Sequence, residues 1–465
     1  MKRRTILALL VLLVGAFAFA AAGCGGDDDD ETTPAATGGE TDGEAAPVEL
    51  PPVTALPTAS CTDIEYEGEG DPQALIATDL PLQGSSRTQT LQMTAAIRQI
   101  LTERDWKAGD INIGYQSCDD ATAQAGAWDS GKCSSNANSY AAEPSLLGLI
   151  GTFNSGCAAI IIPVLNQAPG GPLAMVSPAN TFVCLTQAAP ACSEDEPDVY
   201  YPTGARNYTR VVANDAYQGA AVAEFMQKEG VTKLFLLNDE QAYGLGVASN
   251  LRDAAEFLGI EIVGFEAWDP KASNYEALMN QVKESGADAL FLGGLIDENG
   301  AQLIKDKVKV LGPNDDVKLF MPDGFTTQTT IDESGVENTR GAFFSVAGLP
   351  TDEFASESAQ EFITTFQESL GGEPVDPYAI YGAQAAVVLL DAIAASDGSR
   401  EDIITQLFAT DCQGCFLGDF TFSPEGDPIS SGDIVVISIS EGQEELEPVE
   451  TIAPAQETVD AALGL

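Results

Sequence analysis

The sequence contains no histidine, and this absence excludes several kinds of active site. Without histidine the chain cannot form a Ser-His-Asp or Cys-His catalytic group, a histidine general base or an HExxH zinc site. It also lacks the GxSxG and GxxxxGK[ST] motifs of hydrolases and nucleotide-binding loops. Its 71 acidic residues supply carboxylate pairs by number alone, but no order of motifs around them indicates a glycosidase. We therefore expect a protein that is not an enzyme and that uses no cofactor or metal.

Basic residues are also scarce. The chain has 21 Lys and Arg residues against 71 Asp and Glu residues, which gives a formal net charge of −50. A polyanion of this size repels nucleic acid, because DNA and RNA are bound through basic patches. The charge therefore excludes a nucleic-acid partner, and its simplest role is to keep the protein soluble.

An apolar run next to basic residues stands at the N-terminus. The basic stretch Lys2–Arg4 precedes the apolar run Ile6–Phe19, and small residues then lead to Cys24. This segment resembles a bacterial lipoprotein signal, which implies that residues 1–23 are removed and that Cys24 is lipidated. The alternative is an uncleaved signal anchor, but the run is short for a membrane span of about 20 residues.

Two segments are poor in large apolar side chains. Residues 24–57 are rich in Gly, Asp, Glu, Thr and Pro, and residues 441–465 are acidic and weakly apolar. Such compositions bury too little surface to offset the entropy lost on folding. We expect a disordered acidic tether after the lipidated cysteine and an acidic tail at the C-terminus. The protein would then be lipid-anchored on the extracytoplasmic face of the bacterial membrane.

Eight cysteines remain once Cys24 is assigned to lipidation, and an even number in an exported chain indicates disulfides. Eight cysteines allow 105 pairings, so the sequence does not fix the connectivity. The CxxC pair near the C-terminus has a redox interpretation too, although it lacks the strand-to-helix context of such motifs. Proximity along the chain favours three pairs and leaves a fourth by elimination: Cys118–Cys133, Cys184–Cys192, Cys412–Cys415 and Cys61–Cys157.

Short apolar runs alternate with amphipathic segments from residue 110 onward, and this alternation predicts parallel sheets covered by helices. The region is too long for one core of about 250–300 residues, so we expect two α/β lobes. A closing antiparallel hairpin is expected from 418–423 and 433–440. Strands are expected at 111–115, 146–151, 173–178, 233–239, 261–268, 289–294, 318–324 and 341–346. Helices are expected at 87–103, 217–229, 246–258, 275–285, 301–311, 354–370 and 379–395.

A small polar cluster interrupts the apolar stretch Leu146–Asn166. Thr152, Asn154, Ser155 and Gly156 stand between a predicted buried strand and a predicted buried helix. Strand ends followed by helix N-termini form the binding face of a parallel sheet, and a helix N-terminus favours an anion. The cluster thus indicates half of a carboxylate or phosphate cradle.

The alternative for this cluster is a plain helix cap, in which Ser155 or Asn154 caps the helix without any ligand. The next predicted strand end repeats the arrangement, because Asn180 and Thr181 follow the strand-ending Pro178. Two consecutive strand ends with hydroxyl residues favour a binding site over two independent caps.

The order of motifs along the chain is informative as a set. It runs IGTFNSG, LAMVSPANT, RVVANDAYQG, NDEQAYGLG, LFLGGLIDENG, MPDG and DPYAIYGAQAA. Over about residues 78–440 this order resembles the leucine/isoleucine/valine-binding proteins, the type I extracytoplasmic solute receptors of ABC transporters. The resemblance implies an α/β protein with two Rossmann-like lobes, whose parallel sheets are joined by a hinge of three crossing segments (the type I periplasmic binding protein fold). Lobe 1 would comprise 58–212 and 347–415, and lobe 2 would comprise 213–346 and 416–440.

The resemblance also implies where a ligand would bind. Such receptors hold their ligand in the cleft between the lobes and close by hinge motion. The loops Phe153–Ser155 and Ala179–Thr181 match those that hold the ligand carboxylate, with Ser155, Thr181, Phe153, Asn154 and Ala179 as contacts. Ser155 and Thr181 would be the carboxylate donors.

Other matched positions are assigned by the same resemblance. Asp323 would pair with the ligand ammonium, because a buried charge requires a counter-charge; its alternative is a turn residue before a glycine. Tyr243 would form a wall of the cleft, or else pack in the core. Gln83 and Ser85 would lie at the rim, and Asp215 would be a hinge or rim contact.

The function implied is that of a substrate-binding lipoprotein of an ABC importer. It would capture a branched-chain or other amino acid, or a similar small carboxylate, as a monomer that delivers it to an ABC permease in the membrane. One alternative is a ligand sensor of the same fold that signals to a membrane partner, and another is an envelope hydrolase. The segment Cys118–Cys133 is longer than the family pattern suggests, which leaves the identity of the ligand open.

Overall fold

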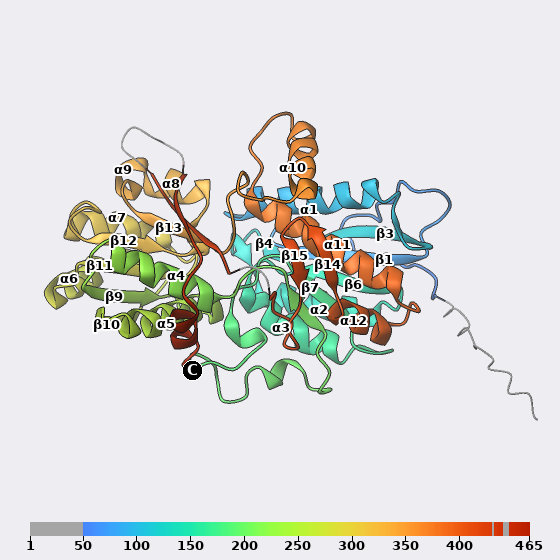
Figure 1. The fold of residues 1–465 in the computed structure, drawn as a ribbon, viewed down its shortest axis with the longest axis horizontal. Coiled ribbons are helices and arrows are strands. Elements are labelled where there is room, and N and C mark those ends of the chain that lie inside the picture. Colours follow the sequence, from blue (N-terminus) through green and yellow to red (C-terminus); the bar gives the residue numbers. More distant parts are fainter. Residues whose placement is uncertain (1–49, 430–431, 440–445) are drawn as a thin grey trace, which may run out of the picture. The chain divides into compact units, whose positions relative to one another are not determined.

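A computed structural model describes residues 50–429, 432–439 and 446–465. The predicted signal peptide, Cys24 and the tether as far as residue 49 lie outside the described residues. Two large sheets, each with its own helices, organise the described chain (Figure 1). We refer to these two sheets with their helices as lobe 1 and lobe 2.

Lobe 1 is built on a six-stranded sheet with the order β2-β3-β1-β6-β7-β8. All neighbouring pairs are parallel except β2 with β3. The central strand β1 is buried at every position, as expected for a parallel strand covered on both faces. The strands are β1 (Ala74–Leu80), β2 (Lys107–Ala108), β3 (Ile111–Asp119), β6 (Leu146–Gly151), β7 (Ala174–Ser177) and β8 (Tyr208–Arg210).

Helices and two small hairpin-like pairs complete lobe 1. Helix α11 has the length and apolar composition of a membrane span, but 78% of its most apolar window is buried inside the protein, so it is a core helix. The helices are α1 (Arg87–Glu103), α2 (Ser130–Ala142), α3 (Ser155–Asn166), α10 (Glu357–Ser369), α11 (Pro377–Ala395) and α12 (Arg400–Phe408), with the 3-10 turns η1 (Val183–Leu185) and η2 (Asp198–Tyr200). The short pairs are β4 (Ala121–Thr122) with β5 (Ala127–Trp128), and β14 (Asp411–Cys415) with β15 (Gly418–Thr421).

Lobe 2 contains a seven-stranded sheet with the order β10-β9-β11-β12-β13-β16-β17. Strands β10, β9, β11, β12 and β13 pair in parallel, and the β13–β16 and β16–β17 pairs are antiparallel. The strands are β9 (Lys233–Asn238), β10 (Glu261–Ala267), β11 (Ala289–Gly293), β12 (Lys318–Met321), β13 (Phe343–Val346), β16 (Ile434–Ser438) and β17 (Glu447–Ile452). The helices are α4 (Asp215–Lys228), α5 (Ala242–Phe257), α6 (Glu276–Ser285), α7 (Gly300–Leu311), α8 (Gln328–Ser334), α9 (Val336–Thr339) and α13 (Gln456–Ala462), with the 3-10 turn η3 (Asp323–Phe325).

The closing hairpin predicted from 418–423 and 433–440 is wrong. Strand β15 pairs with β14 beside lobe 1, whereas β16 pairs with β13 and β17 in lobe 2. The turn-rich stretch between them crosses between the lobes, and the backbone N–H of Arg210 donates to the carbonyl of Gly426 in it. Local turn signals identified a break in the chain but not the partner of each strand.

The ends of the chain contain more structure than their composition suggested. Residues 446–465 were expected in an acidic tail, but β17 pairs with β16 and α13 packs against α4 and α5. Val459 and Ala462, three residues apart on α13, supply the buried side of that helix. Within the expected tether, Leu56 is buried, and its N–H donates to Gln116 Oε1 in lobe 1 at 2.7 Å.

Two predicted disulfides are present and two are wrong. The structure contains Cys184–Cys192 and Cys412–Cys415, as proximity along the chain suggested. Instead of Cys118–Cys133 and Cys61–Cys157, it pairs Cys61 with Cys118 and Cys133 with Cys157. Cys61 forms a β-bridge with Cys118, and packing of α2 on α3 brings the other two sulfurs together. Tertiary packing, not sequence separation, therefore decides these two pairs.

Candidate functional site

One cavity lies where the carboxyl ends of strands from both lobes meet. Its lining comes from the end of β5 and the loops after β6 and β7 in lobe 1, and from the loops after β9, β11 and β12 in lobe 2. The walls nearly touch, since the space between them is only about 20 Å³, room for about one water. The lining residues are Trp128, Phe153, Asn154, Ser155, Gly156, Ala179, Thr181, Gln241, Tyr243, Leu295, Asp323 and Gly324.

The cavity brings together seven residues that the sequence had singled out. Five of them come from the two lobe 1 loops: Phe153, Asn154, Ser155, Ala179 and Thr181. Tyr243 and Asp323 come from lobe 2. The predicted convergence of strand ends thus produces one shared surface.

Asn180 holds the two lobe 1 loops in register. Its Nδ2 donates to the carbonyl oxygens of Thr152 at 2.9 Å and Phe153 at 3.0 Å. Its Oδ1 accepts from the Tyr208 hydroxyl at 3.1 Å. Sequence reasoning noted Asn180 only as a polar residue at a strand end, because the partners of its side chain come from two other strands.

Ser155 is the first residue of α3, and it is buried. Its Oγ accepts from the backbone N–H of Phe182 at 3.3 Å, which ties this loop to the one carrying Thr181. Among the described residues, no side chain caps the N-terminus of α3, so the helix-cap alternative for Ser155 and Asn154 is not what the structure has. An uncapped helix start beside two hydroxyls suits a carboxylate.

Asp323 begins the turn η3, and its side chain is held by three donors. Its Oδ1 accepts from Gln218 Nε2 at 2.7 Å and from the Tyr243 hydroxyl at 2.6 Å, and its Oδ2 accepts from the Tyr378 hydroxyl at 3.2 Å. Burial raises the pKa of Asp323, and the three hydrogen bonds act in the opposite direction. Asp323 is therefore more than a turn residue.

Gly324 allows the close packing around this acid. A Cβ at this position would lie 2.4 Å from the carbonyl oxygen of Gly294 and 2.9 Å from a ring carbon of Tyr243. The backbone N–H of Gly324 donates to the Tyr243 hydroxyl at 3.1 Å. Tyr243 is thus both packed in lobe 2 and part of the wall of this cavity, and its contact with a ligand stays a prediction.

Asp215 starts helix α4 and lies fully buried, not at the rim. Neither of its carboxylate oxygens has a hydrogen-bond partner among the residues that the structure describes. Burial raises the pKa of Asp215 well above its ordinary value and the neighbouring Asp323 carboxylate raises it further, whereas the nearby Thr181 hydroxyl and the Arg210 guanidinium lower it. An unpaired buried carboxylate is costly, and a cationic partner would relieve that cost.

Tyr378 links the two lobes at this site. It lies in α11 of lobe 1 and donates to Asp323 of lobe 2. Its ring packs edge-on against Phe153 with 5.7 Å between the ring centroids. From the sequence, this segment was only part of the motif order, and the signal for Tyr378 was its place at the start of the longest described helix.

Gln83 and Ser85 lie outside the cavity. Gln83 Nε2 donates to Asp119 Oδ2 at 2.6 Å within lobe 1. Ser85 lines a separate cavity of about 640 Å³, and its Oγ donates across the lobes to Asp297 Oδ1 at 2.5 Å. Burial raises the pKa of Asp297 to about 6. Ser85 is therefore a contact between the lobes in this structure.

Three cavity residues were missed by sequence reasoning: Trp128, Gln241 and Leu295. Trp128 belongs to the long segment between Cys118 and Cys133, and Leu295 follows the Gly293–Gly294 strand end. The unusual length of the first segment was the one available signal, because a longer loop at a strand end has to cover something.

Comparison with known proteins identifies the family and the fold. The model of a family described as "Periplasmic binding protein" matches residues 80–443. A curated relative, Leu/Ile/Val-binding protein homolog 2 of Brucella abortus (strain 2308), is 23% identical over 381 residues, covering 79% of this chain and 91% of the relative. The Leu-, Ile-, Val-, Thr- and Ala-binding protein of Pseudomonas aeruginosa is 28% identical over 116 residues, covering 25% of this chain and 30% of the relative.

Solved structures show the same fold. The leucine-binding protein LivK of Thermotoga maritima superposes with a TM-score of 0.69 at 20% identity, covering 82% of this chain and 99% of LivK. A solute-binding protein of Rhodopseudomonas palustris in complex with benzoate superposes with a TM-score of 0.64 at 17% identity, and the match covers 82% of this chain and 96% of that protein. The family match spans most of the chain, and the fold of these neighbours is the predicted type I fold. The chain therefore belongs to the periplasmic binding protein family, that of the Leu/Ile/Val-binding proteins it resembles, and is an extracytoplasmic binding protein rather than an enzyme.

Proposed function

We propose that this protein is the substrate-binding lipoprotein of an ABC importer and that its ligand is an unmodified amino acid. The observation that carries the proposal is the polarity of one cavity. Hydroxyls and a helix N-terminus lie on its lobe 1 side, and an acid lies on its lobe 2 side, with a second buried acid nearby. This arrangement matches a small molecule with a carboxylate at one end and an ammonium at the other.

The carboxylate end of the ligand would lie against lobe 1. Ser155 and Thr181 supply hydroxyl groups, and the first amide groups of α3 have no side-chain acceptor among the described residues. A helix N-terminus carries partial positive charge, so an anion is stabilised there. Asn180 fixes both loops and so pre-organises these donors before a ligand arrives.

The ammonium end would lie against Asp323 and Asp215. Asp323 is already oriented by Gln218, Tyr243 and Tyr378, while Asp215 has no such support among the described residues. A bound ammonium would give both acids a counter-charge and would restore the ionised form that burial disfavours. Two buried acids thus make the α-ammonium the expected anchor.

Ligand entry requires that the lobes separate. A space of about 20 Å³ holds no amino acid, so the contacts between the lobes have to open and re-form around the ligand. These contacts include Ser85 with Asp297, Gln89 Nε2 with the carbonyl of Thr326 at 3.4 Å, and Tyr378 with Asp323. Hinge closure of this kind excludes water and strengthens the ionic contacts.

A simple carboxylic acid is the second candidate, because the solute-binding protein of R. palustris was solved with benzoate. Such a ligand has no cation to pair with the buried acids of this chain. It would bring a negative charge close to Asp323 and Asp215, which the low local dielectric penalises. The two acids therefore favour the amino acid over the simple acid.

Isothermal titration of the soluble protein against the twenty amino acids and benzoate tests the proposal. We expect one or a few amino acids to bind and benzoate to give no heat. Asp323→Asn should weaken that binding at least tenfold, because a hydrogen bond to a charged group contributes about 1.5–3 kcal/mol. Asp79→Asn is the matched control, since Asp79 is a buried acid of lobe 1 that does not line the cavity. If none of the twenty amino acids binds, the proposed ligand class is ruled out.

The lipid anchor and the transport role are tested in cells. Cys24→Ala should abolish the incorporation of a labelled fatty acid into the protein, because Cys24 is the residue proposed to carry the lipid. Uptake of the bound amino acid should fall when the gene is deleted. Unchanged uptake, together with a ligand-dependent response of a membrane partner, would instead identify a sensor.

A further inference from the structure

Trp128 lines two cavities. The inner one is the candidate site of about 20 Å³, and the outer one has about 630 Å³ and is lined by more polar residues. Trp128, Gly156 and Gln241 line both of them. The indole therefore stands at the boundary between the space for the ligand and the larger space beyond it.

The contact of Trp128 with Gly156 is close. A Cβ at Gly156 would lie 2.7 Å from two carbons of the indole ring, a distance that real Cβ atoms do not adopt. Gly156 follows Ser155, the predicted carboxylate donor, so the indole lies beside the loop that would hold the ligand. Trp128 also packs against the hydrophobic clusters of both lobes. It is placed to contact a ligand that touches both walls.

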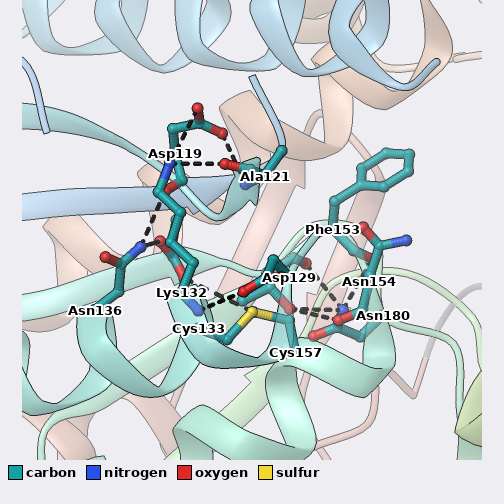
Figure 2. Close-up of a disulfide and its surroundings, with 12 residues drawn as sticks. Asp119, Ala121, Asp129, Lys132, Cys133, Asn136, Phe153, Asn154, Cys157 and Asn180 are labelled. Atoms are coloured by element: carbon teal, nitrogen blue, oxygen red, sulfur yellow. Dashed lines mark hydrogen bonds and ion pairs between the residues drawn. A yellow bond between two sulfur atoms is a disulfide. The ribbon is translucent and has the colours of Figure 1, made fainter. Parts of the chain in front are cut away.

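The local structure fixes the position of this side chain. Trp128 ends strand β5, and Asp129 immediately caps α2 by accepting from the N–H of Lys132 at 2.9 Å. The disulfide Cys133–Cys157 then joins the first turn of α2 to α3, as Figure 2 shows. This disulfide links the segments that carry Trp128 and Gly156, because Cys133 is five residues after Trp128 and Cys157 directly follows Gly156.

The outer cavity is chemically unlike the inner one. Its lining includes Asp129, Lys271 and Glu298, and Gln241 Nε2 donates to the Glu298 carboxylate. On the inner side, Leu295 and the ring of Tyr243 provide apolar surface beside Trp128. An apolar side chain of a ligand would gain favourable contacts on the inner side of the indole. It would lose them if it extended into the polar outer cavity.

We propose that Trp128 is a specificity-determining residue that limits the length of the ligand side chain. The ligand would be an amino acid with a compact apolar side chain that ends against the indole. This inference rests on the proposed function, because it assumes that an amino acid occupies the inner cavity. It adds the residue that would limit the length of the side chain, about which the buried acids and hydroxyls give no information.

The first test is Trp128→Ala, titrated with alanine, valine, leucine, phenylalanine and the dipeptide Leu-Leu. Removing the indole should enlarge the space on the inner side of the boundary that Trp128 lines. We expect binding of the best compact amino acid to fall at least about tenfold, since lost apolar contacts in a pocket cost that much. Phenylalanine or Leu-Leu should gain affinity relative to it. Trp128→Phe should shift the profile in the same direction by a smaller amount, and it covers the case in which Trp128→Ala does not fold.

Fluorescence gives an independent readout. The chain has three tryptophans, and Trp106 and Trp268 are each only 2% exposed in the hydrophobic core. We expect binding of the compact amino acid to change the emission of the wild-type protein. Most of that change should disappear in Trp128→Phe, measured at a ligand concentration that saturates the variant by titration calorimetry.

The disulfide supplies a matched pair of variants. Replacing both Cys133 and Cys157 by serine should shift the ligand profile in the direction of Trp128→Ala, because the indole is then held less firmly against α3. Replacing both Cys412 and Cys415 by serine should leave the profile unchanged, since that disulfide lies in the β14–β15 pair and lines neither cavity.

The outcomes separate this inference from the proposed function. If the wild-type protein binds none of the panel, the proposed function fails and the inference fails with it. If the wild-type protein binds an amino acid but Trp128→Ala and Trp128→Phe keep the same order of affinities, the inference is overturned while the proposed function stands. If ligand binding changes the emission of Trp128→Phe as much as that of the wild-type protein, the ligand does not contact the indole and the inference is overturned.

Discussion

The two acids of the site differ in what surrounds them. Asp323 accepts hydrogen bonds from Gln218, Tyr243 and Tyr378, whereas Asp215 has no partner for either oxygen within the described chain. Burial raises the pKa of both residues. A group left unsupported in the interior usually has a functional reason, and here a cationic ligand provides one.

Asp215→Asn should separate stability from binding. The change removes a buried carboxyl that gains little from its surroundings, so the melting temperature without ligand should stay the same or rise. Amino-acid binding should weaken about 10- to 150-fold, the equivalent of about 1.5–3 kcal/mol for a hydrogen bond to a charged group. Thermal melts and titration calorimetry measure the two effects.

Asp239→Asn is compared with Asp215→Asn, because we expect the two variants to differ in melting temperature. Asp239 is also buried, but its oxygens accept from the backbone N–H groups of Gln241 at 2.9 Å and Leu295 at 3.2 Å. An asparagine can replace only one of these acceptors, so this variant should melt at a lower temperature. A lower melting temperature for Asp215→Asn than for Asp239→Asn would contradict the described difference between the two sites.

At the scale of elements, the end of β8 carries the main ionic contact of the hinge. Arg210 is fully buried, and its Nε donates to Asp427 Oδ1 at 2.6 Å in the last crossing segment. Its Nη1 donates to the carbonyls of Asn180 and Phe182, each at 2.9 Å. One side chain thereby joins a crossing segment to the loop that carries Thr181.

Arg210→Met should lower the free energy of unfolding by about 3–5 kcal/mol, because it leaves Asp427 buried without its partner. Adding Asp427→Leu should recover part of the loss, since the unpaired charge is then removed as well. Urea titration measures both values. Arg98→Met is the matched control, because the Arg98–Glu65 pair is partly exposed and should contribute about 0–1 kcal/mol. Equal losses in Arg210→Met and Arg98→Met would contradict the role given to Arg210.

Elements defined by local pattern were the most predictable from the sequence. The apolar runs at 146–151 and 289–294 became strands β6 and β11, and the amphipathic segment 87–103 became α1. Each of these segments has one clear hydrophobic pattern, either a short apolar run or a helical spacing of apolar residues, and polar or small residues mark its ends. The short strand β8 and the C-terminal helix α13 were missed, because each depends on a surface that distant residues provide.

The site was predictable to the extent that it follows strand ends. Ser155, Thr181 and Asp323 line one cavity because parallel strands present their carboxyl ends at the same edge. Gln83 lies outside the cavity because its amide bonds to Asp119. Trp128 could not be placed from sequence, since its position depends on a disulfide between α2 and α3 that proximity along the chain did not indicate.

At the scale of the whole molecule, acidity is the dominant property. The chain carries a formal net charge of −50, and several acids are buried. Burial raises the pKa of Asp79 to about 7, that of Asp239 to about 7 and that of Asp376 to about 6. The folded protein thus holds protons that the unfolded chain releases above pH of about 4.

This difference fixes the sign of the pH dependence. Between pH of about 4 and 7 the folded state binds more protons than the unfolded state, so stability falls as the pH rises. We expect the melting temperature without ligand to be several degrees higher at pH 5 than at pH 8. Asp79→Asn should make the slope shallower. A melting temperature that rises from pH 5 to pH 8 would contradict the burial of these acids.

The central claim is that one cavity recognises both ends of an amino acid. Its most direct test is a calorimetric titration of the wild-type protein with its best-bound amino acid and with the deaminated analogue of that ligand; for leucine the analogue is 4-methylpentanoate. We expect the amino acid to bind and the analogue to bind at least tenfold more weakly, because Asp323 and Asp215 then lack a cation. Equal or tighter binding of the analogue would contradict the central claim.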